Sequence, residues 1–425
     1  MQKPQHGVSY YQIILLILAG ETVFILPFVL ARIFRPTFLD VFNLTNLQLG
    51  SCFSIYGVIA LLSYVYGGTL ADKFTPRKLI SVSLVLTSIG GFLMATFPSY
   101  LILKIIYGYW GFTTVFLFWG AMIKGTRVWG GTMQQGKAFG LLEGGRGFVA
   151  ATIGAVGVFI FSMLLPDNIV NAFLEERKEA FRYVILFTSM LAIVVGGLVF
   201  LLMEDQNRSS SIQNSDTHTI SNIKKVFKIE SVWWLMLIVL SAYVGYKITD
   251  IFSLYAAEVM LFNEIEAAQV GTFQLYLRPV ICVSIGLLAD KTRGAAWLIN
   301  GFIVMLAGAL LFATGLIQSG ASLFFILSLI TTTTGVYALR TLYFAVFQEG
   351  YIPIRITGTA VGVISVIGYT PDIFMGPIMG YLLDKSPGIY GHQQVFMMLA
   401  AFSVLGLFAA IKFSHLKNKN NLILT

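Results

Sequence analysis

The sequence Gly67-Gly68-Thr69-Leu70-Ala71-Asp72-Lys73-Phe74-Thr75-Pro76-Arg77-Lys78 lies between two apolar runs, and part of it returns as Gly286-Leu287-Leu288-Ala289-Asp290-Lys291-Thr292-Arg293. Each copy ends an apolar run with Leu-Ala-Asp-Lys and adds basic residues before the next run begins. The charged side chains must stay hydrated while both flanks suit lipid, so each copy predicts a tight membrane-surface turn between two spanning helices. The copies are 218 positions apart in 425 residues, which predicts two similar halves.

The composition excludes a water-soluble fold. Hydrophobic residues make up 57% of the chain and charged residues 11%, whereas about a quarter of a soluble domain is charged. The net charge of +8 does not indicate a nucleic-acid partner, because Lys and Arg lie mostly in short loops, as topology signals do. We therefore expect a polytopic protein that is surrounded by the lipid bilayer.

About twenty apolar residues are needed to cross a bilayer as a helix. Long apolar runs predict twelve spans, at 11–34, 47–70, 78–97, 100–123, 138–163, 181–203, 231–256, 266–289, 295–317, 321–347, 356–382 and 392–413. These runs do not alternate with period two, so they predict helices and not barrel strands. No small-residue cleavage pattern follows the first apolar run, which we interpret as an uncleaved spanning helix.

Basic residues alternate between the predicted loops. One set of loops holds most of the Lys and Arg, including Lys73, Arg77 and Lys78, and the other holds little beyond Arg35, Arg177, Lys178, Arg182 and Lys385. The positive-inside rule then predicts that both termini are cytoplasmic.

The segment 204–230 is the one extended polar stretch, and Ser, Asn and charged residues dominate it. This composition predicts a flexible cytoplasmic linker between a six-helix bundle at 1–203 and a second at 231–425. The end of the linker, Ile223 to Ile229, is either a basic amphipathic helix on the inner leaflet or a solvated connection.

The doubled loop motif resembles the loops between helices two and three, and eight and nine, of major facilitator superfamily (MFS) transporters. The resemblance covers essentially the whole chain. It implies an all-α membrane protein with the MFS fold, in which twelve transmembrane helices form two pseudo-symmetric six-helix bundles with substrate bound near mid-membrane. It also implies a bacterial inner-membrane location, and we expect a monomer.

Within the superfamily, the Thr75-Pro76 turn after Asp72 looks like the organophosphate and sugar-phosphate permease branch, and Tyr246 to Asp250 is similar to that branch's span-seven motif. The segments 139–147 and 368–374 look typical of the YihN-like group of bacterial permeases. This sequence differs from that branch at the two positions where the branch has its substrate-binding arginines. Those positions align with Val29 and Gly245, so the resemblance alone does not imply an organophosphate substrate.

In the resembled family the loop motif forms a network that latches the outward-open state. That role carries over to Asp72, Arg77 and Asp290. At helix ends these carboxylates can accept hydrogen bonds from neighbouring helix N-termini and pair with basic side chains.

Charges inside membrane spans are costly and usually face a cavity or a partner. Glu21 lies about 15 Å along the first predicted helix and could bind and release a proton, or be a structural acid between helices. Asp372 follows Thr370-Pro371 and predicts a kinked helix with a carboxylate at the break. It could neutralise Arg340 or be a second protonatable site.

Arg32 and Asp250 are 218 positions apart, the same offset as the two loop motifs. Pseudo-symmetry therefore predicts matching depths on spans one and seven, where an ion pair could gate the extracellular side. The alternative is that both side chains snorkel to water.

Lys247 and Arg340 are the candidate ligands for an anionic or strongly polar substrate, because both lie well inside predicted spans. Four tyrosines lie within a turn of them and could supply hydroxyls and a stacking face: Tyr243, Tyr246, Tyr337 and Tyr343. Ordinary helix packing is the alternative for each tyrosine.

Glu143 and Arg146 are three residues apart and can pair along one helix face. A structural pair that stabilises the inward-closed state is our first interpretation, and a substrate role is the second.

Enzyme signatures are absent from the sequence: it has no Walker-type loop, and its four histidines have no metal-ligand spacing. We therefore expect no catalytic residues, cofactor or metal. We expect a secondary transporter that moves a small, polar, anionic organic solute by alternating access, driven by a proton or solute gradient. The alternatives are a proton-coupled multidrug exporter and a transporter-like nutrient sensor.

Overall fold

The computed structural model describes residues 10–130, 135–165, 173–204, 224–347, 349–352 and 357–416. The described segments contain twelve helical spans that are long and apolar enough to cross a membrane, which confirms the predicted number. Every one of them is helical because lipid offers no hydrogen-bond partner to the backbone, so its polar groups must be satisfied within the helix.

The contacts divide the chain into two compact units. Unit 1 contains Met1–Ala31 and Val58–Asn207, and unit 2 contains Arg32–Gly57 and Arg208–Thr425. Residues 32–57 therefore pack with the helices of the second half, although the sequence repeat assigns them to the first.

Unit 1 contains the C-terminal part of α4 (Asn46–Lys73) together with α1 (Tyr10–Phe24), η1 (Ile25–Val29), α5 (Pro76–Met94), α6 (Tyr100–Gly111), η2 (Phe112–Trp119), α7 (Gly120–Gly130), α8 (Gln135–Leu164) and α9 (Leu174–Leu202). The four-residue helix α2 (Leu30–Ile33) crosses the boundary between the units. Within unit 1, α1 packs against α8 and α5 packs against α9.

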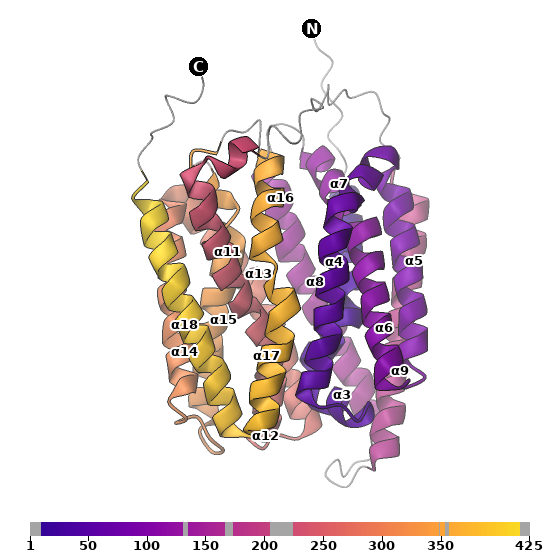
Figure 1. Ribbon diagram of the computed structural model, residues 1–425. Coiled ribbons are helices and arrows are strands. Elements are labelled where there is room, and N and C mark those ends of the chain that lie inside the picture. Colours follow the sequence, from indigo (N-terminus) through magenta and orange to yellow (C-terminus); the bar gives the residue numbers. More distant parts are fainter. Residues whose placement is uncertain are drawn as a thin grey trace, which may run out of the picture. The chain divides into compact units, whose positions relative to one another are not determined.

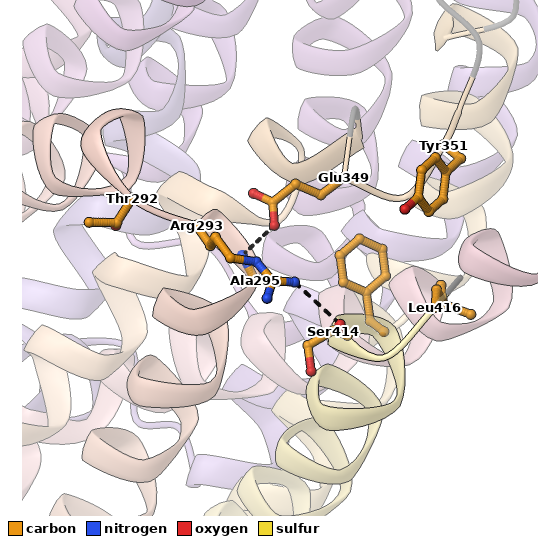
Figure 2. A pocket seen from close by; sticks show the side chains of 8 residues that line it. Thr292, Arg293, Ala295, Glu349, Tyr351, Ser414 and Leu416 are labelled. Carbon is orange, nitrogen blue, oxygen red and sulfur yellow. Dashed lines mark hydrogen bonds between the residues drawn. The ribbon is translucent and has the colours of Figure 1, made fainter. Parts of the chain in front are cut away.

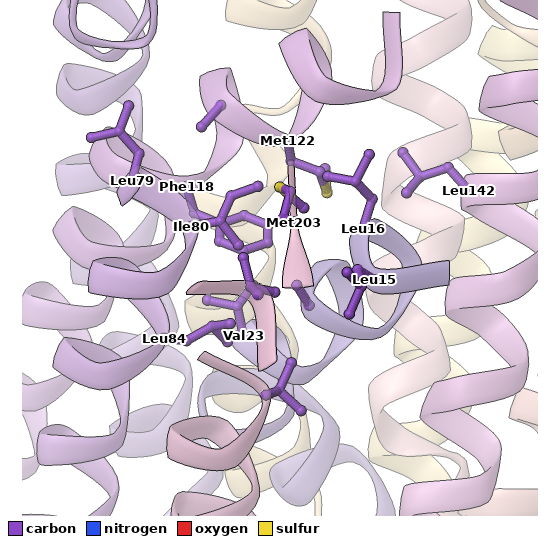
Figure 3. Packing of buried hydrophobic residues seen from close by; sticks show 14 of the residues in the cluster. Leu15, Leu16, Val23, Leu79, Ile80, Leu84, Phe118, Met122, Leu142 and Met203 are labelled. Atoms are coloured by element: carbon purple, nitrogen blue, oxygen red, sulfur yellow. The ribbon is translucent and has the colours of Figure 1, made fainter. Parts of the chain in front are cut away.

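Buried apolar side chains hold the helices of unit 1 together (Figure 3). Leu16 on α1, Ile80 on α5, Phe118 in η2 and Leu142 on α8 each expose 2% of their surface or less. In lipid these contacts stabilise through van der Waals packing, because moving an apolar side chain from lipid into the bundle gains no hydrophobic free energy.

Two π-helical turns interrupt the spans of unit 1. The first, η1, contains Pro27, which has no backbone N–H to donate. The second, η2, lies between α6 and α7. Such turns are frequent at functional sites because they change the direction in which nearby side chains project.

Unit 2 contains the N-terminal part of α4 together with α3 (Arg35–Val41), α11 (Glu230–Ile248), η4 (Thr249–Ile251), α12 (Phe252–Glu258), α13 (Glu264–Lys291), α14 (Gly294–Ala313), α15 (Ser322–Leu342), η5 (Ala345–Phe347), α16 (Thr357–Gly368), α17 (Pro371–Lys385) and α18 (Ile389–Ser414). The long helices of this unit run side by side, and the short α3 and α12 lie near one end of them (Figure 1).

Two breaks in the spans of unit 2 position charged residues. The 3-10 turn η4 separates α11 from α12 and contains Asp250. The predicted break before Asp372 is present, because α16 ends at Gly368 and α17 begins at Pro371. Both carboxylates therefore lie at breaks, where the backbone departs from a straight helix.

The N-terminal part of α4 packs tightly on α17. A Cβ atom on Gly50 would collide with the carbonyl group of Gly376, and one on Gly380 would collide with the backbone of Asn46. Glycine at these positions lets the two backbones meet directly, as small residues do between membrane helices. This packing explains why residues 46–57 belong to unit 2.

Candidate substrate-binding site

Lys247 contacts two carboxylates in the interior of unit 2. Its Nζ lies 3.2 Å from Asp372 Oδ1 and 3.5 Å from Asp250 Oδ2. The Lys247 side chain is 2% exposed. The sequence predicted its depth in the span, and the structure brings it together with Asp372, which the sequence analysis associated with Arg340.

Arg32 and Asp250 form a buried ion pair. Arg32 Nε donates a hydrogen bond to Asp250 Oδ1 over 2.6 Å, and both side chains are 2% exposed. The Arg32 backbone carbonyl also accepts a hydrogen bond from Ser253 Oγ. The equal offset in the sequence thus pointed to residues that are neighbours in space, and neither side chain extends to water.

Tyr246 lies between two guanidinium groups. The Arg340 guanidinium carbon is 4.0 Å from the centre of the Tyr246 ring, and that of Arg32 is 4.7 Å from it. Arg32 Nη1 also donates a hydrogen bond to the Tyr246 hydroxyl. A desolvated cation over an aromatic face is attracted by roughly 2 kcal/mol, so Tyr246 helps to hold both arginines inside the helices.

The other tyrosines form an aromatic cluster beside Asp372. The Tyr243 hydroxyl lies 3.1 Å from each oxygen of the Asp372 carboxylate. The Tyr243 ring contacts those of Tyr246 and Tyr369, and the hydroxyls of Tyr343 and Tyr369 are 3.3 Å apart. Three of the four predicted tyrosines therefore belong to one aromatic cluster, which contacts the carboxylate through Tyr243, and Tyr337 interacts electrostatically with Arg32.

Three further polar residues of unit 2 were not predicted as site residues: Arg278 and Gln274 on α13, and Arg35 at the start of α3. All three are at most 1% exposed. The sequence analysis assigned Arg35 to a loop, yet it donates two hydrogen bonds to the side-chain carbonyl of Asn46. Arg278 could have been found by the rule that identified Lys247, because it interrupts an apolar run just before Pro279.

Several cations converge in this cluster. Arg32, Arg278 and Tyr246 interact electrostatically with Tyr337, which places Arg278 beside the other cations. Arg32, Lys247, Arg278 and Arg340 thus lie near the carboxylates Asp250 and Asp372, and Arg35 also interacts electrostatically with Asp250. A convergence of cations in one place is suited to binding an anion.

Unit 1 contains a separate ion cluster. Arg146 Nη1 donates to Glu143 Oε1 over 2.7 Å, the pair predicted from their spacing, and Arg146 Nε donates to Glu21 Oε2 over 3.1 Å. The Arg146 guanidinium also faces the Phe24 ring at 5.4 Å. Glu21 is thus paired with a cation, and the contact joins α1 to α8.

The predicted latch residues are described only in part. The side chains of Asp72 and Asp290 lie outside the described residues. Arg77 lies at the start of α5, where its Nη1 donates a long hydrogen bond of 3.5 Å to the Met203 carbonyl and its guanidinium faces the Phe200 ring at 5.2 Å. These contacts tie α5 to the end of α9.

A cavity of about 300 Å³ lies near the second loop motif, at the ends of α13, α14 and α18. Glu349 accepts hydrogen bonds from the N–H groups of Gly294 and Ala295, and Arg293 donates to the Ser414 carbonyl (Figure 2). Glu349 therefore caps the N-terminus of α14. We interpret this cavity as structural and not as a substrate site, because Glu349 and Arg293 both bind backbone groups that connect the helix ends.

No group of three or more His, Cys, Asp or Glu side chains that could hold a metal occurs among the described residues. A family model described as Major Facilitator Superfamily matches residues 13–371. This chain belongs to the Major Facilitator Superfamily. It is therefore a membrane transporter and not an enzyme.

Two curated relatives of this MFS chain come from Escherichia coli (strain K12). The inner membrane protein YqcE is 27% identical over 386 residues, which are 89% of this chain and 88% of YqcE. The inner membrane protein YihN is 26% identical over 403 residues, which are 93% of each chain. The similarity to YihN confirms the resemblance to the YihN-like group.

Solved structures support the MFS fold. A bacterial homologue of the human lysosomal transporter Spinster, inward-facing and unoccupied, has a TM-score of 0.74 at 17% identity and covers 95% of this chain and 96% of its own. A point mutant of the nucleoside transporter NupG has a TM-score of 0.72 at 14% identity and covers 95% of this chain and 99% of its own. At these identities the comparison establishes the fold alone.

Proposed function

We propose that this MFS protein is a secondary transporter of a small, polar, anionic organic solute in a bacterial inner membrane, and that it works by alternating access. The observation that carries the proposal is the convergence of Arg32, Lys247, Arg278 and Arg340 around Tyr246 in unit 2. Charges inside membrane spans usually face a cavity or a partner. An anionic solute can interact with several of these cations at once, so its binding is favoured by groups that the fold already holds in place.

The roles of the proposed site residues follow from their contacts. Lys247 and Arg340 bind the anionic group of the solute, and Tyr243, Tyr246, Tyr337 and Tyr343 supply ring faces and hydroxyls. An Arg guanidinium can form two parallel hydrogen bonds to a carboxylate or phosphate, whereas the Lys ammonium acts as a point charge.

The ion pair Arg32–Asp250 and the cap formed by Asp384 act as an outer gate in this proposal. Asp384 accepts hydrogen bonds from the N–H groups of Asn46 over 2.9 Å and Leu47 over 2.7 Å, at the N-terminus of α4. A carboxylate at this position also interacts favourably with the helix dipole. For the site to open to the outside, residues 32–57 must break their contacts with Asp250 and Asp384.

Asp372 is our first candidate for coupling to protons. Its carboxylate and an anionic solute both need Lys247, so they compete for the same cation. Protonation of Asp372 would release Lys247, and a proton and an anion would then bind together more favourably than either binds alone. Glu21, which Arg146 binds in unit 1, is the second candidate.

The remaining assignments are structural. Glu143 pairs with Arg146 along α8, Arg146 in turn holds α1 through Glu21, and we assign the Glu143–Arg146 pair to stabilising the inward-closed state. Asp72, Arg77 and Asp290 form the cytoplasmic latch that the family resemblance implies. We also propose that both termini are cytoplasmic and that the protein acts as a monomer.

Ligand-dependent thermal stabilisation of the purified protein tests the proposal. Sugar phosphates, organic acids, amino acids and nucleosides are compared, since a ligand at 100 times its Kd stabilises by about 2.7 kcal/mol. We expect at least one organic anion to raise the Tm, and we expect Lys247→Ala and Arg340→Ala to abolish the shift.

The matched control is Lys385→Ala, which removes an exposed lysine at the end of α17. This variant should respond to the same anion as the wild type does. An anion-dependent shift that persists in both site variants would exclude Lys247 and Arg340 as ligands. A response only to cations or neutral solutes would contradict the anionic substrate.

A further inference from the structure

Two buried polar atoms beside the cation cluster have no hydrogen-bond partner among the described residues. They are the hydroxyl of Tyr337 and the side-chain carbonyl oxygen of Gln274, and both residues are 0% exposed. Leaving such an atom unsatisfied in the interior is unfavourable, because the atom loses its hydrogen bonds to water on burial. Because native proteins satisfy most buried polar atoms, these two require an explanation.

The two residues lie on helices that contact each other, Gln274 on α13 and Tyr337 on α15. Gln274 and Arg278 are four residues apart, so they share one face of α13. Cys282, one turn further on, brings its Sγ to 3.9 Å from the Tyr337 carbonyl, and Gln274 Nε2 donates to the Thr249 carbonyl over 2.8 Å. The face of α13 that carries Arg278 therefore points toward both Tyr337 and the turn that contains Asp250.

The chemistry of these groups specifies their partners. A carbonyl oxygen such as that of Gln274 can only accept, a guanidinium such as that of Arg278 can only donate, and the Tyr337 hydroxyl can do both. A carboxylate or phosphate oxygen can accept a hydrogen bond from Arg278, but it has no proton to give to Gln274. A hydroxyl group on the same solute can donate to Gln274 and exchange a hydrogen bond with Tyr337.

We propose that Arg278, Gln274 and Tyr337 form a subsite in which Arg278 binds the charged group of the solute and Gln274 and Tyr337 bind its hydroxyl groups, so that the solute is a hydroxylated organic anion. This inference rests on the proposed function and narrows its substrate class. Arg278 and the other cations bind the charged group, and the oxygens of Gln274 and Tyr337 select solutes with hydroxyls. Sites built to hydrogen-bond a hydroxyl discriminate strongly against analogues that lack it.

Matched pairs of anions test the substrate class. Gluconate is compared with hexanoate and glycerol 3-phosphate with propyl phosphate, since the second member of each pair lacks the hydroxyls, and sorbitol serves as the polyol that lacks the charge. We expect a rise in Tm with at least one hydroxylated anion and an affinity at least tenfold weaker for its matched analogue. Equal stabilisation by hydroxylated and unhydroxylated anions would overturn the inference.

The variant Tyr337→Phe tests the site with minimal risk to folding, because it removes one hydroxyl that has no partner among the described residues. Without ligand its Tm should equal or exceed that of the wild type, and its affinity for the stabilising anion should fall about tenfold. Arg278→Gln and Gln274→Leu should also weaken binding.

Tyr255→Phe is the matched control, because the equally buried Tyr255 hydroxyl donates to the Ile317 carbonyl over 2.7 Å. It should lower the Tm of the unliganded protein and leave the affinity unchanged.

The outcomes separate this inference from the proposed function. If Lys247→Ala abolishes binding while all three subsite variants bind like the wild type, the subsite is excluded and the anion site stands. If no organic anion stabilises the wild-type protein, both proposals fail.

Discussion

Lys247 contacts two carboxylates that belong to different elements, Asp250 in η4 and Asp372 in α17. Sequence alone indicated that Lys247 lies deep in a span, since a charge inside an apolar run is visible without a structure. It could not indicate the partner, because Asp372 lies 125 positions further along the chain. Only the packing of α17 against α11 brings the two side chains together.

Replacing Lys247 by Met should destabilise the protein strongly. Removing one partner of a buried ion pair typically costs about 3–5 kcal/mol, and here Asp372 loses the ammonium group that contacts it while Asp250 keeps Arg32. Adding Asp372→Asn should recover part of the loss, because one uncompensated charge is then removed. Thermal unfolding of the single and the double variant in detergent measures the loss of stability and its partial recovery. A double variant less stable than Lys247→Met would contradict the pairing.

Asp372→Asn on its own should separate solute binding from proton coupling. Without the competing carboxylate, Lys247 remains available, so the stabilising anion should bind more tightly and its affinity should no longer change with pH. Solute exchange should persist in proteoliposomes, whereas accumulation driven by a pH gradient should be lost. Glu21→Gln is the matched comparison. Loss of pH-driven accumulation in Glu21→Gln but not in Asp372→Asn would assign the coupling to unit 1.

At the scale of elements, the contact between α4 and α17 was the least predictable from sequence. The Thr370-Pro371 pair indicated the break before α17, and its position agrees with the structure. Asp384, however, resembles an ordinary acid at a helix end, and nothing local reveals that it caps α4. Its role depends on glycines in two distant helices, Gly50 and Gly376, which allow the backbones to meet.

Asp384→Ala should loosen the N-terminal part of α4. Cys52 reports this directly, because it lies on α4, is 0% exposed and becomes the only thiol when Cys282 is replaced by Ser. In that background, Asp384→Ala should increase the rate of Cys52 labelling by N-ethylmaleimide several-fold, and Asp384→Asn should have a smaller effect. The loss of a helix cap typically costs about 1 kcal/mol, which corresponds to roughly a fivefold change in an opening equilibrium.

Asp40→Ala is the control, because it removes an exposed carboxylate from the neighbouring helix α3. It should leave the labelling of Cys52 unchanged. If Asp384→Ala also leaves that rate unchanged, the proposed gate does not depend on this cap.

At the scale of the whole molecule, hydropathy and the repeated loop motif were sufficient to predict the class, the twelve spans and the superfamily. A membrane imposes span length and backbone satisfaction on every helix, so these features are encoded locally. The division into two units is not encoded locally, because residues 32–57 precede the linker in sequence yet pack with the second half. Arg278 was missed although its signal was present in the sequence.

The proposed orientation can be tested with single cysteines in a variant that lacks Cys52 and Cys282. Tyr390 at the start of α18 is 70% exposed, and Lys224 before α11 is also exposed. With cytoplasmic termini, a membrane-impermeant thiol reagent added to intact cells should label Tyr390→Cys and not Lys224→Cys. The reverse pattern would invert the topology.

Counterflow in proteoliposomes tests the central claim most directly. Vesicles are loaded with the anion that gives the largest thermal shift and diluted into buffer that contains a trace of the same labelled anion. The proposed transporter should concentrate the label transiently inside the vesicles, and Lys247→Ala should abolish this overshoot. A wild-type protein that binds the anion but shows no counterflow, or a Lys247→Ala variant with undiminished counterflow, would contradict the claim that these buried cations carry the solute.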